Sequence, residues 1–194
     1  IGLQDHLSKA ADGLTAGDYS GGEAKYQLAK ESTKTLQRSI ESPQVTFISE
    51  FQIFAPAVEN WRLLTMAASD ITGATGELLS LYGELSGKNG AQKIFSDGAI
   101  DLDGLESVAP RVKRVQGLLG SAETNLRFIN AEDPIADRLD GVRDQALAEM
   151  APVQTAVDVL SDIAPVLPET LGANGLKRYL IAIGNQAEMR ASFG

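Results

Sequence analysis

Cysteine is absent from this 194-residue chain, and histidine and tryptophan each occur only once. Without cysteine the chain can form no disulfide, thiolate zinc site, iron–sulfur cluster or thiol nucleophile. The single histidine, His6, lies beside Leu3 and Leu7 in an amphipathic segment and has no partner at a metal-binding or catalytic spacing. It is therefore interpreted as a residue on the flank of a helix, and we expect neither a cofactor nor a metal ion.

Basic residues are also scarce: 17 lysines and arginines face 26 acidic residues, which gives a formal net charge of −9. A nucleic-acid partner requires a basic face, so the composition argues against one. No apolar run reaches the 18 residues needed to span a bilayer. Because the chain begins at Ile1 instead of methionine, we expect that a preceding segment, such as a signal peptide or membrane anchor, has been removed.

What the chain does contain is apolar residues that recur every three or four positions, as in amphipathic helices. Two such segments, 3–14 and 24–40, are separated by a predicted turn at 18–22 and indicate an antiparallel helical hairpin. Residues 43–55 are apolar with little polar interleaving. This stretch fits an extended or irregular connector, and a short buried helix fits it too.

Three longer helices are predicted after Pro56, a residue that suits a helix N-terminus. The first runs to about residue 85 and carries Trp61 in its apolar stripe, where we expect a core or seam position with the indole N–H at the boundary. A loop at 97–104, with Asp101 or Asp103 as the helix cap, precedes the second, which runs to about residue 130. The third, from 133 to 164, has a coiled-coil-like seam roughly 45 Å long in which Pro152 predicts a kink.

The expected fold is therefore mainly α: an elongated antiparallel bundle of about five helices over residues 1–176. Residues 177–194 are expected to start a β-containing segment, with a short C-terminal strand at 179–183. An unpaired strand leaves backbone donors and acceptors unmet, so we expect this strand to pair with another copy of the chain or with the rest of a longer precursor.

Two local motifs fail closer inspection, and a third is a small basic group on a helix. The glycines of 83–89 have the wrong spacing for a phosphate-binding loop, and the residue after Lys88 is neither serine nor threonine. Counted from Asp97 or from Asp101, the acidic cluster at 97–106 has valine at the twelfth position of a calcium loop, so no metal site is predicted there. Arg111, Lys113 and Arg114 are typical of a solvated helix face, and a weak contact with anionic glycan or lipid headgroups is the alternative.

One polar cluster does stand out, directly after the predicted strand. It consists of Asn185, Gln186, Glu188 and Arg190. If the strand continues, Glu188 and Arg190 share one face. One interpretation is an internal hydrogen-bonding network. The other is a binding or active site, with Glu188 as acid or base and Arg190 holding a phosphate or carboxylate.

The same tail resembles an actinobacterial family known only as domain of unknown function 4012. Its motif is Arg-Tyr-Leu, four variable residues, Asn-Asn-Ala-Glu-x-Arg and a small-residue ending. The matching residues here are Arg178, Tyr179, Leu180, Asn185, Ala187, Glu188, Arg190, Ala191, Ser192 and Gly194. Gln186 replaces the second asparagine, and Phe193 replaces a glycine. The resemblance implies an extracytoplasmic, cell-envelope protein that is anchored by an N-terminal transmembrane helix and associated with surface polysaccharide. It implies no catalytic residues.

Together these observations lead to two main hypotheses. The first is a non-enzymatic envelope module that acts as a structural or assembly scaffold. Its expected partners are a second copy of the chain, the rest of its precursor or an envelope glycan. Its membrane contact is expected only through an anchor absent from this chain. The alternative is an enzyme that acts on an envelope glycan or a lipid-linked precursor at the C-terminal polar cluster. A cleaved precursor whose halves stay paired and a helical ligand-sensing domain are further readings.

Overall fold

The computed structural model describes residues 19–87, 95–96, 99–129 and 136–179, and these are mainly helical, as the periodicity predicts. Their long helices are α2 (Tyr19–Ile40), α4 (Ala55–Ser86), α6 (Val108–Arg127) and α7 (Ala136–Ile163). Short helices lie between or after them: α3 (Pro43–Ser49), α5 (Leu102–Glu106) and α8 (Leu167–Thr170). The first predicted helix, with His6, lies outside the described residues.

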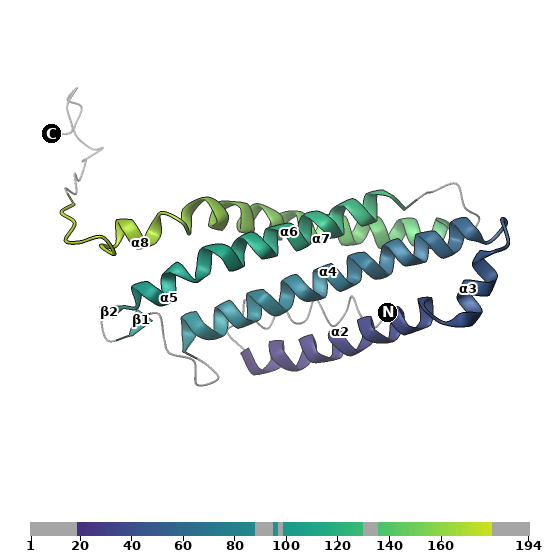
Figure 1. The fold of residues 1–194 in the computed structure, drawn as a ribbon, viewed down its shortest axis with the longest axis horizontal. Helices are drawn as coiled ribbons and strands as arrows, with labels where there is room; N and C mark the ends of the chain where they lie inside the picture. The colour runs from purple at the N-terminus through teal and green to yellow at the C-terminus, as the bar shows by residue number, and fades with distance from the viewer. Residues whose placement is uncertain (1–18, 88–94, 97–98, 130–135, 180–194) are drawn as a thin grey trace, which may run out of the picture.

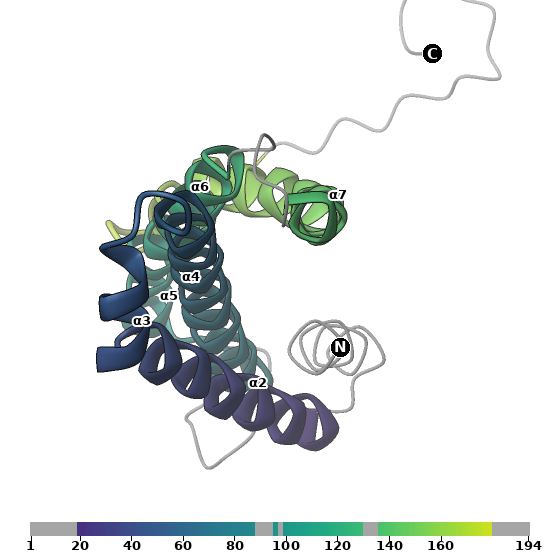
Figure 2. The ribbon, with the colours of Figure 1, turned by 90° about the vertical axis from the view of Figure 1, so that its right-hand side faces the viewer.

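The long helices run antiparallel to their sequence neighbours and form an elongated bundle (Figure 1). With 32 residues, α4 is about 48 Å long at 1.5 Å per residue. Seen from its end, the bundle is an arc in which α2, α4, α6 and α7 are successive neighbours (Figure 2). Helix α3 lies at one end of the rod, and α8 lies at the other, near the paired strands β1 (Phe95–Ser96) and β2 (Ala99–Ile100).

The hydrophobic core runs along α4, α6 and α7. The α6 stripe predicted from the sequence is confirmed, and its members Val112, Val115, Leu119, Ala122 and Leu126 are all buried. They pack with Ala67, Ala74 and Leu81 of α4 and with Leu139, Met150 and Val157 of α7. Burial of these side chains is the main driving force that holds the three helices together.

Helix α4 begins and ends as its sequence predicts. Pro56 lies in its first turn, where the missing N–H has no helical partner to lose. Gly87 ends the helix in the left-handed conformation, with φ of 64°, and its N–H is bonded to the carbonyls of Gly83 and Glu84. Within the helix, Gly76 gives room to α2, because a Cβ at this position would overlap the hydroxyl of Tyr26.

The contact between α2 and α4 uses small and polar residues and only part of the apolar repeat predicted over 24–40. Ala29 of that repeat is buried together with Gly22 and Thr33, whereas Leu28, another member, is 47% exposed. The Thr33 and Thr72 hydroxyls are 2.9 Å apart across this interface, and Gln37 donates to Ser69 at 3.2 Å. Small side chains allow the two backbones to approach closely, so they take the inner face although Leu28 is more hydrophobic.

Several local predictions are wrong. Residues 19–22, predicted as part of a turn, are the first turn of α2, and the predicted loop at 97–104 contains β2 and the start of α5. The capping role of Asp101 is confirmed, because its carboxylate accepts the Gly104 N–H at 3.1 Å. Trp61, predicted as a core or seam residue with its indole N–H at the boundary, is 38% exposed, since α4 turns mostly smaller residues inward.

The C-terminal predictions are largely untested. Residues 176–179 have no regular secondary structure, and the rest of the predicted strand, 180–183, lies outside the described residues. Helix α7 continues through Pro152. Among the described helices, none has the combination of length and hydropathy that a membrane span requires.

Candidate functional site

The residues of the predicted C-terminal site, Asn185, Gln186, Glu188 and Arg190, lie outside the described residues. Of the two motifs that the sequence analysis rejected, residues 83–86 form the last turn of α4, and Asp101 caps α5. Within the described ranges, no three metal-ligating side chains lie close enough together to hold an ion. Three other features of the described residues are candidates for a site: an ion-pair network, a pocket and an apolar tip.

The basic group on α6 is not a simple solvated face. Arg111, whose side chain is only 19% exposed, is bonded to Glu77 at 3.2 Å and to Glu84 at 2.6 Å, both on α4. Arg114 bonds Glu77 at 2.9 Å. Burial is the largest single influence on Glu77 and opposes its ionisation, but the hydrogen bonds and charges of Arg114 and Arg111 together lower the pKa of Glu77. This network joins α4 to α6. The guanidinium groups of Arg111 and Arg114 are both paired with carboxylates of α4.

A small open pocket of about 220 Å³ lies between α6 and α7. Its polar side chains already bond to one another: Gln116 donates to Asp158 at 2.7 Å, and Gln154 donates to Glu123 at 2.9 Å. Arg127, and then Gln154, lower the pKa of Glu123. A ligand would have to break these bonds, so the pocket is better explained as a polar seam between two helices.

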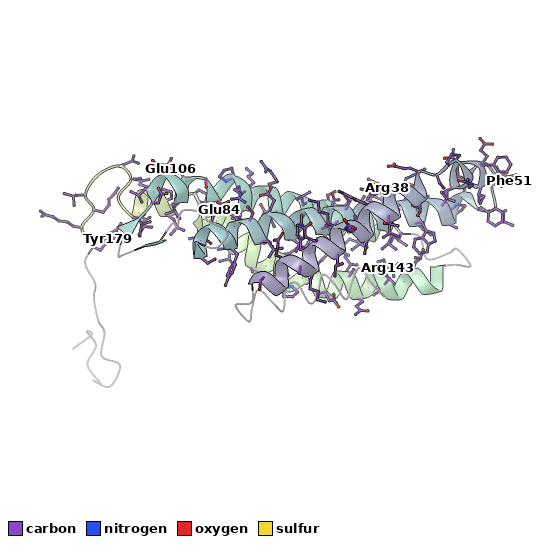
Figure 3. All side chains as sticks on the ribbon, turned by 90° about the horizontal axis from the view of Figure 1, so that it is seen from below. Arg38, Phe51, Glu84, Glu106, Arg143 and Tyr179 are labelled. Carbon is purple, nitrogen blue, oxygen red and sulfur yellow. The ribbon has the colours of Figure 1, made fainter. Side chains whose placement is uncertain are left out.

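The third place is the apolar tip of the rod, which we call the α3 tip and define as residues 43–54. Its large hydrophobic side chains all face solvent: Phe47, Ile48, Phe51, Ile53 and Phe54. Ile53 is 81% exposed, and no residue of α3 is buried. Figure 3 shows Phe51 at the extreme end of the molecule, opposite the end that carries Tyr179.

Local structure explains how this tip forms. Pro43 starts α3 after Ser42, an extended residue at the N-cap position. The N–H groups of Phe51 and Ala55 are then bonded to the carbonyls of Ile48 and Phe51, which carries the chain from α3 to α4 in tight turns. Phe47 and Phe51 stack edge to face, with ring centroids 5.4 Å apart. The apolar side chains are thus fixed on an ordered scaffold.

The hydroxyl groups of the tip are turned back onto its own backbone. Ser42 donates to the Ser39 carbonyl at 2.8 Å, Thr46 to the Ser42 carbonyl at 3.3 Å, and Ser49 to the Thr46 carbonyl at 2.7 Å. Polar side chains that bond in this way no longer need water as a partner. The outer surface of the tip is consequently less polar than its composition indicates.

Sequence reasoning identified this segment but placed it wrongly. It offered a short buried helix as one reading, and the helix exists but is exposed. Among the described residues, α3 makes its main contacts with α2 and α4, and its large apolar side chains stay exposed. The signal that could have located it is the position of an aromatic-rich connection at the end of two long helices, where a neighbouring element cannot reach.

A second exposed apolar surface lies at the opposite end of the rod, where α7 leads into α8. We call it the α7–α8 end and define it by Val159, Leu160, Ile163, Val166 and Leu171, all of them exposed. Leu160 belongs to the seam predicted as buried, and its exposure corrects that prediction. The described chain leaves this end at Tyr179 (Figure 3).

Comparison of the chain with protein-family models, with curated proteins and with solved structures finds no match. The function is therefore inferred from the geometry of the described residues and from the sequence.

Proposed function

We propose that this chain is a scaffold module of the cell envelope, a rod that holds attachments at its two ends. The observation that carries the proposal is the exposure of large apolar side chains at both ends, the α3 tip and the α7–α8 end, while the helices between them form a packed core. Monomeric soluble proteins rarely expose contiguous large apolar patches unless something binds there. The extracytoplasmic location and the link to surface polysaccharide follow from the family resemblance of the C-terminal tail.

At the α7–α8 end we assign one occupant, the segment that follows in the chain, residues 180–194. The described chain leaves the rod at this end, and the next four residues, 180–183, are all apolar. Packed on Leu160 and Ile163, these residues would be a strand whose free edge pairs with another strand. Assembly through that edge is the scaffold activity.

Cross-linking tests this assignment cleanly because the chain has no cysteine of its own. Leu160→Cys combined with Ile183→Cys should form a cross-link within one chain, seen by intact mass after treatment with a short bismaleimide. Pairing Ile183→Cys with Ser80→Cys, an exposed position on α4, is the matched control and should not cross-link. If the first pair forms no link, or links only between chains, the assignment is wrong.

Assembly itself is tested by X-ray scattering in solution and by light scattering on the whole protein. We expect an elongated particle that associates, and we expect the double variant Leu160→Ser with Ile163→Ser to weaken association without lowering the Tm. Val142→Ser, an exposed apolar position elsewhere on α7, is the control. A compact and strictly monomeric particle contradicts the scaffold role. The enzymatic alternative instead predicts that Glu188→Gln abolishes an activity on envelope glycan while the Tm stays unchanged.

A further inference from the structure

We propose that the α3 tip inserts into the interfacial layer of a phospholipid membrane whose headgroups are electrically neutral. The proposal goes beyond the scaffold role and does not depend on it, because the tip and the α7–α8 end lie at opposite ends of the rod. It also adds to the sequence-based expectation, in which the membrane contact was made only by an anchor absent from this chain.

The first argument is the distribution of the apolar side chains around the tip. Phe47 and Ile48 are consecutive and therefore point about 100° apart on the helix. Ile53 and Phe54 extend the apolar surface beyond α3 to the start of α4, and all these side chains are exposed. A groove on a protein contacts one side of a helix, whereas a fluid apolar medium surrounds a protruding tip on all sides. The spread of partly exposed apolar side chains over more than one side of the tip favours the membrane.

The second argument is hydrogen bonding. A polar group placed in lipid must find its partner within the protein, since no water is present to replace it. The hydroxyls of Ser42, Thr46 and Ser49 are bonded to the backbone carbonyls three or four residues before them, in the tip or in the turn that precedes it. Four backbone N–H groups, those of Glu50, Phe51, Phe54 and Ala55, are also bonded to carbonyls, as at Phe54, which reaches the Phe51 carbonyl at 2.9 Å. These groups would keep their partners if the tip left water.

The third argument is charge. Glu50 is the single ionisable side chain between residues 42 and 58, so the tip can enter the interface at low electrostatic cost. Behind the tip, positive and negative charges are equal in number. Arg38 is matched by Glu41 on one side, and Glu59 forms an ion pair with Arg62 on the other. Membrane-binding helices that select anionic lipids carry an excess of lysine and arginine. This tip has none, which points to neutral headgroups.

Trp61 follows in the second turn of α4 and is partly exposed, so it would lie near the headgroups. Because it is the only tryptophan in the chain, its fluorescence reports on this region alone.

Vesicle flotation with the full chain tests the proposal. With pure phosphatidylcholine vesicles, we expect the folded protein to float and the Trp61 emission to shift to shorter wavelength. The double variant Phe51→Ser with Phe54→Ser should reduce the partition coefficient at least tenfold at an unchanged Tm. The matched control Val166→Ser with Leu171→Ser removes exposed apolar side chains from the opposite end and should change partitioning less than twofold.

The outcomes separate the alternatives. If the double variant lowers the Tm, Ile53→Ser replaces it, because Ile53 is the most exposed of these side chains. Absence of flotation with folded wild-type protein overturns the proposal. The tip would then bind in a groove on another protein. Binding that requires phosphatidylglycerol and disappears in 0.5 M salt, where the Debye length is about half of its value in 0.1 M salt, also overturns it, since it would reveal a contact through basic residues.

Discussion

The inner face of α6 and the α3 tip are both rich in large apolar residues, yet one is buried and the other is exposed. On α6 these residues recur at helical spacing and meet two neighbours, α4 and α7, which bury Val115 and Leu126 almost completely. At the tip, apolar residues are consecutive and the helix is at the end of the rod, where Phe47 and Phe51 contact each other and solvent. The comparison teaches that apolar content alone does not locate a core. Periodicity and the presence of a covering neighbour do.

The largest expected effect is the difference between truncations in the two regions. Leu126→Ala removes a fully buried side chain from the core and should lower the free energy of unfolding by about 2–5 kcal/mol. Phe51→Ala, at a half-exposed site, should lower it by no more than about 0.5 kcal/mol. Chemical denaturation of both variants measures the difference. A similar loss for the two would show that the tip is part of the folded core.

A smaller effect is expected where α2 meets α4. Gly76→Ala places a Cβ against the Tyr26 hydroxyl, and the resulting overlap should cost about 1–2 kcal/mol of stability despite the better helix propensity of alanine. Gly117→Ala is the control on α6, where the new Cβ meets no atom within 4 Å, and it should stabilise by about 0.5–1 kcal/mol. If both variants are stabilised equally, the contact between Tyr26 and Gly76 is absent in solution.

The ion pairs on α4 and α6 predict a pH dependence. The pKa of Glu77 in the folded protein lies below its ordinary value of 4.5, so its contribution to stability is present above that value and is lost as the pH falls through the folded pKa. Glu77→Gln should therefore destabilise at pH 7 by about 1 kcal/mol, discounted for partial exposure, and by progressively less below pH 4.5. Glu59→Gln, in an exposed ion pair with Arg62, should have almost no effect at either pH.

The last effect concerns the Thr33–Thr72 hydroxyl pair in the polar contact between α2 and α4. Each threonine is within bonding distance of the carbonyl one turn before it as well as of the other hydroxyl. A double-mutant cycle with Thr33→Val and Thr72→Val should give a coupling energy of about 0.5–1.5 kcal/mol. A coupling near zero would mean that each hydroxyl bonds only within its own helix.

The helices themselves were predictable because they depend on local patterns. The repeat of Val112, Val115 and Leu119 predicts the buried face of α6, and Pro56 and Gly87 predict the ends of α4. The face that α2 turns inward was not predictable, because close approach through Gly22 and Gly76 depends on the partner helix.

The candidate site shows the same limit. The sequence identified residues 43–55 as unusually apolar, but their exposure depends on which elements reach the end of the rod, a tertiary property. The ion pairs of Arg111 with Glu77 and Glu84 join residues that are 34 and 27 positions apart, so a local reading saw only a basic helix face. The predicted cluster around Glu188 lies outside the described residues and stays a prediction.

Native-state amide hydrogen exchange tests most directly whether the apolar residues divide into a core that holds the fold and a tip that does not. We expect the amides of α4 and α6 to exchange only through global unfolding, with protection that falls in step with stability in denaturant. Amides of α3 should exchange through local opening with far lower protection, and phosphatidylcholine vesicles should slow them selectively. If α3 is as protected as α6 in the absence of vesicles, the tip belongs to the core and the account is wrong.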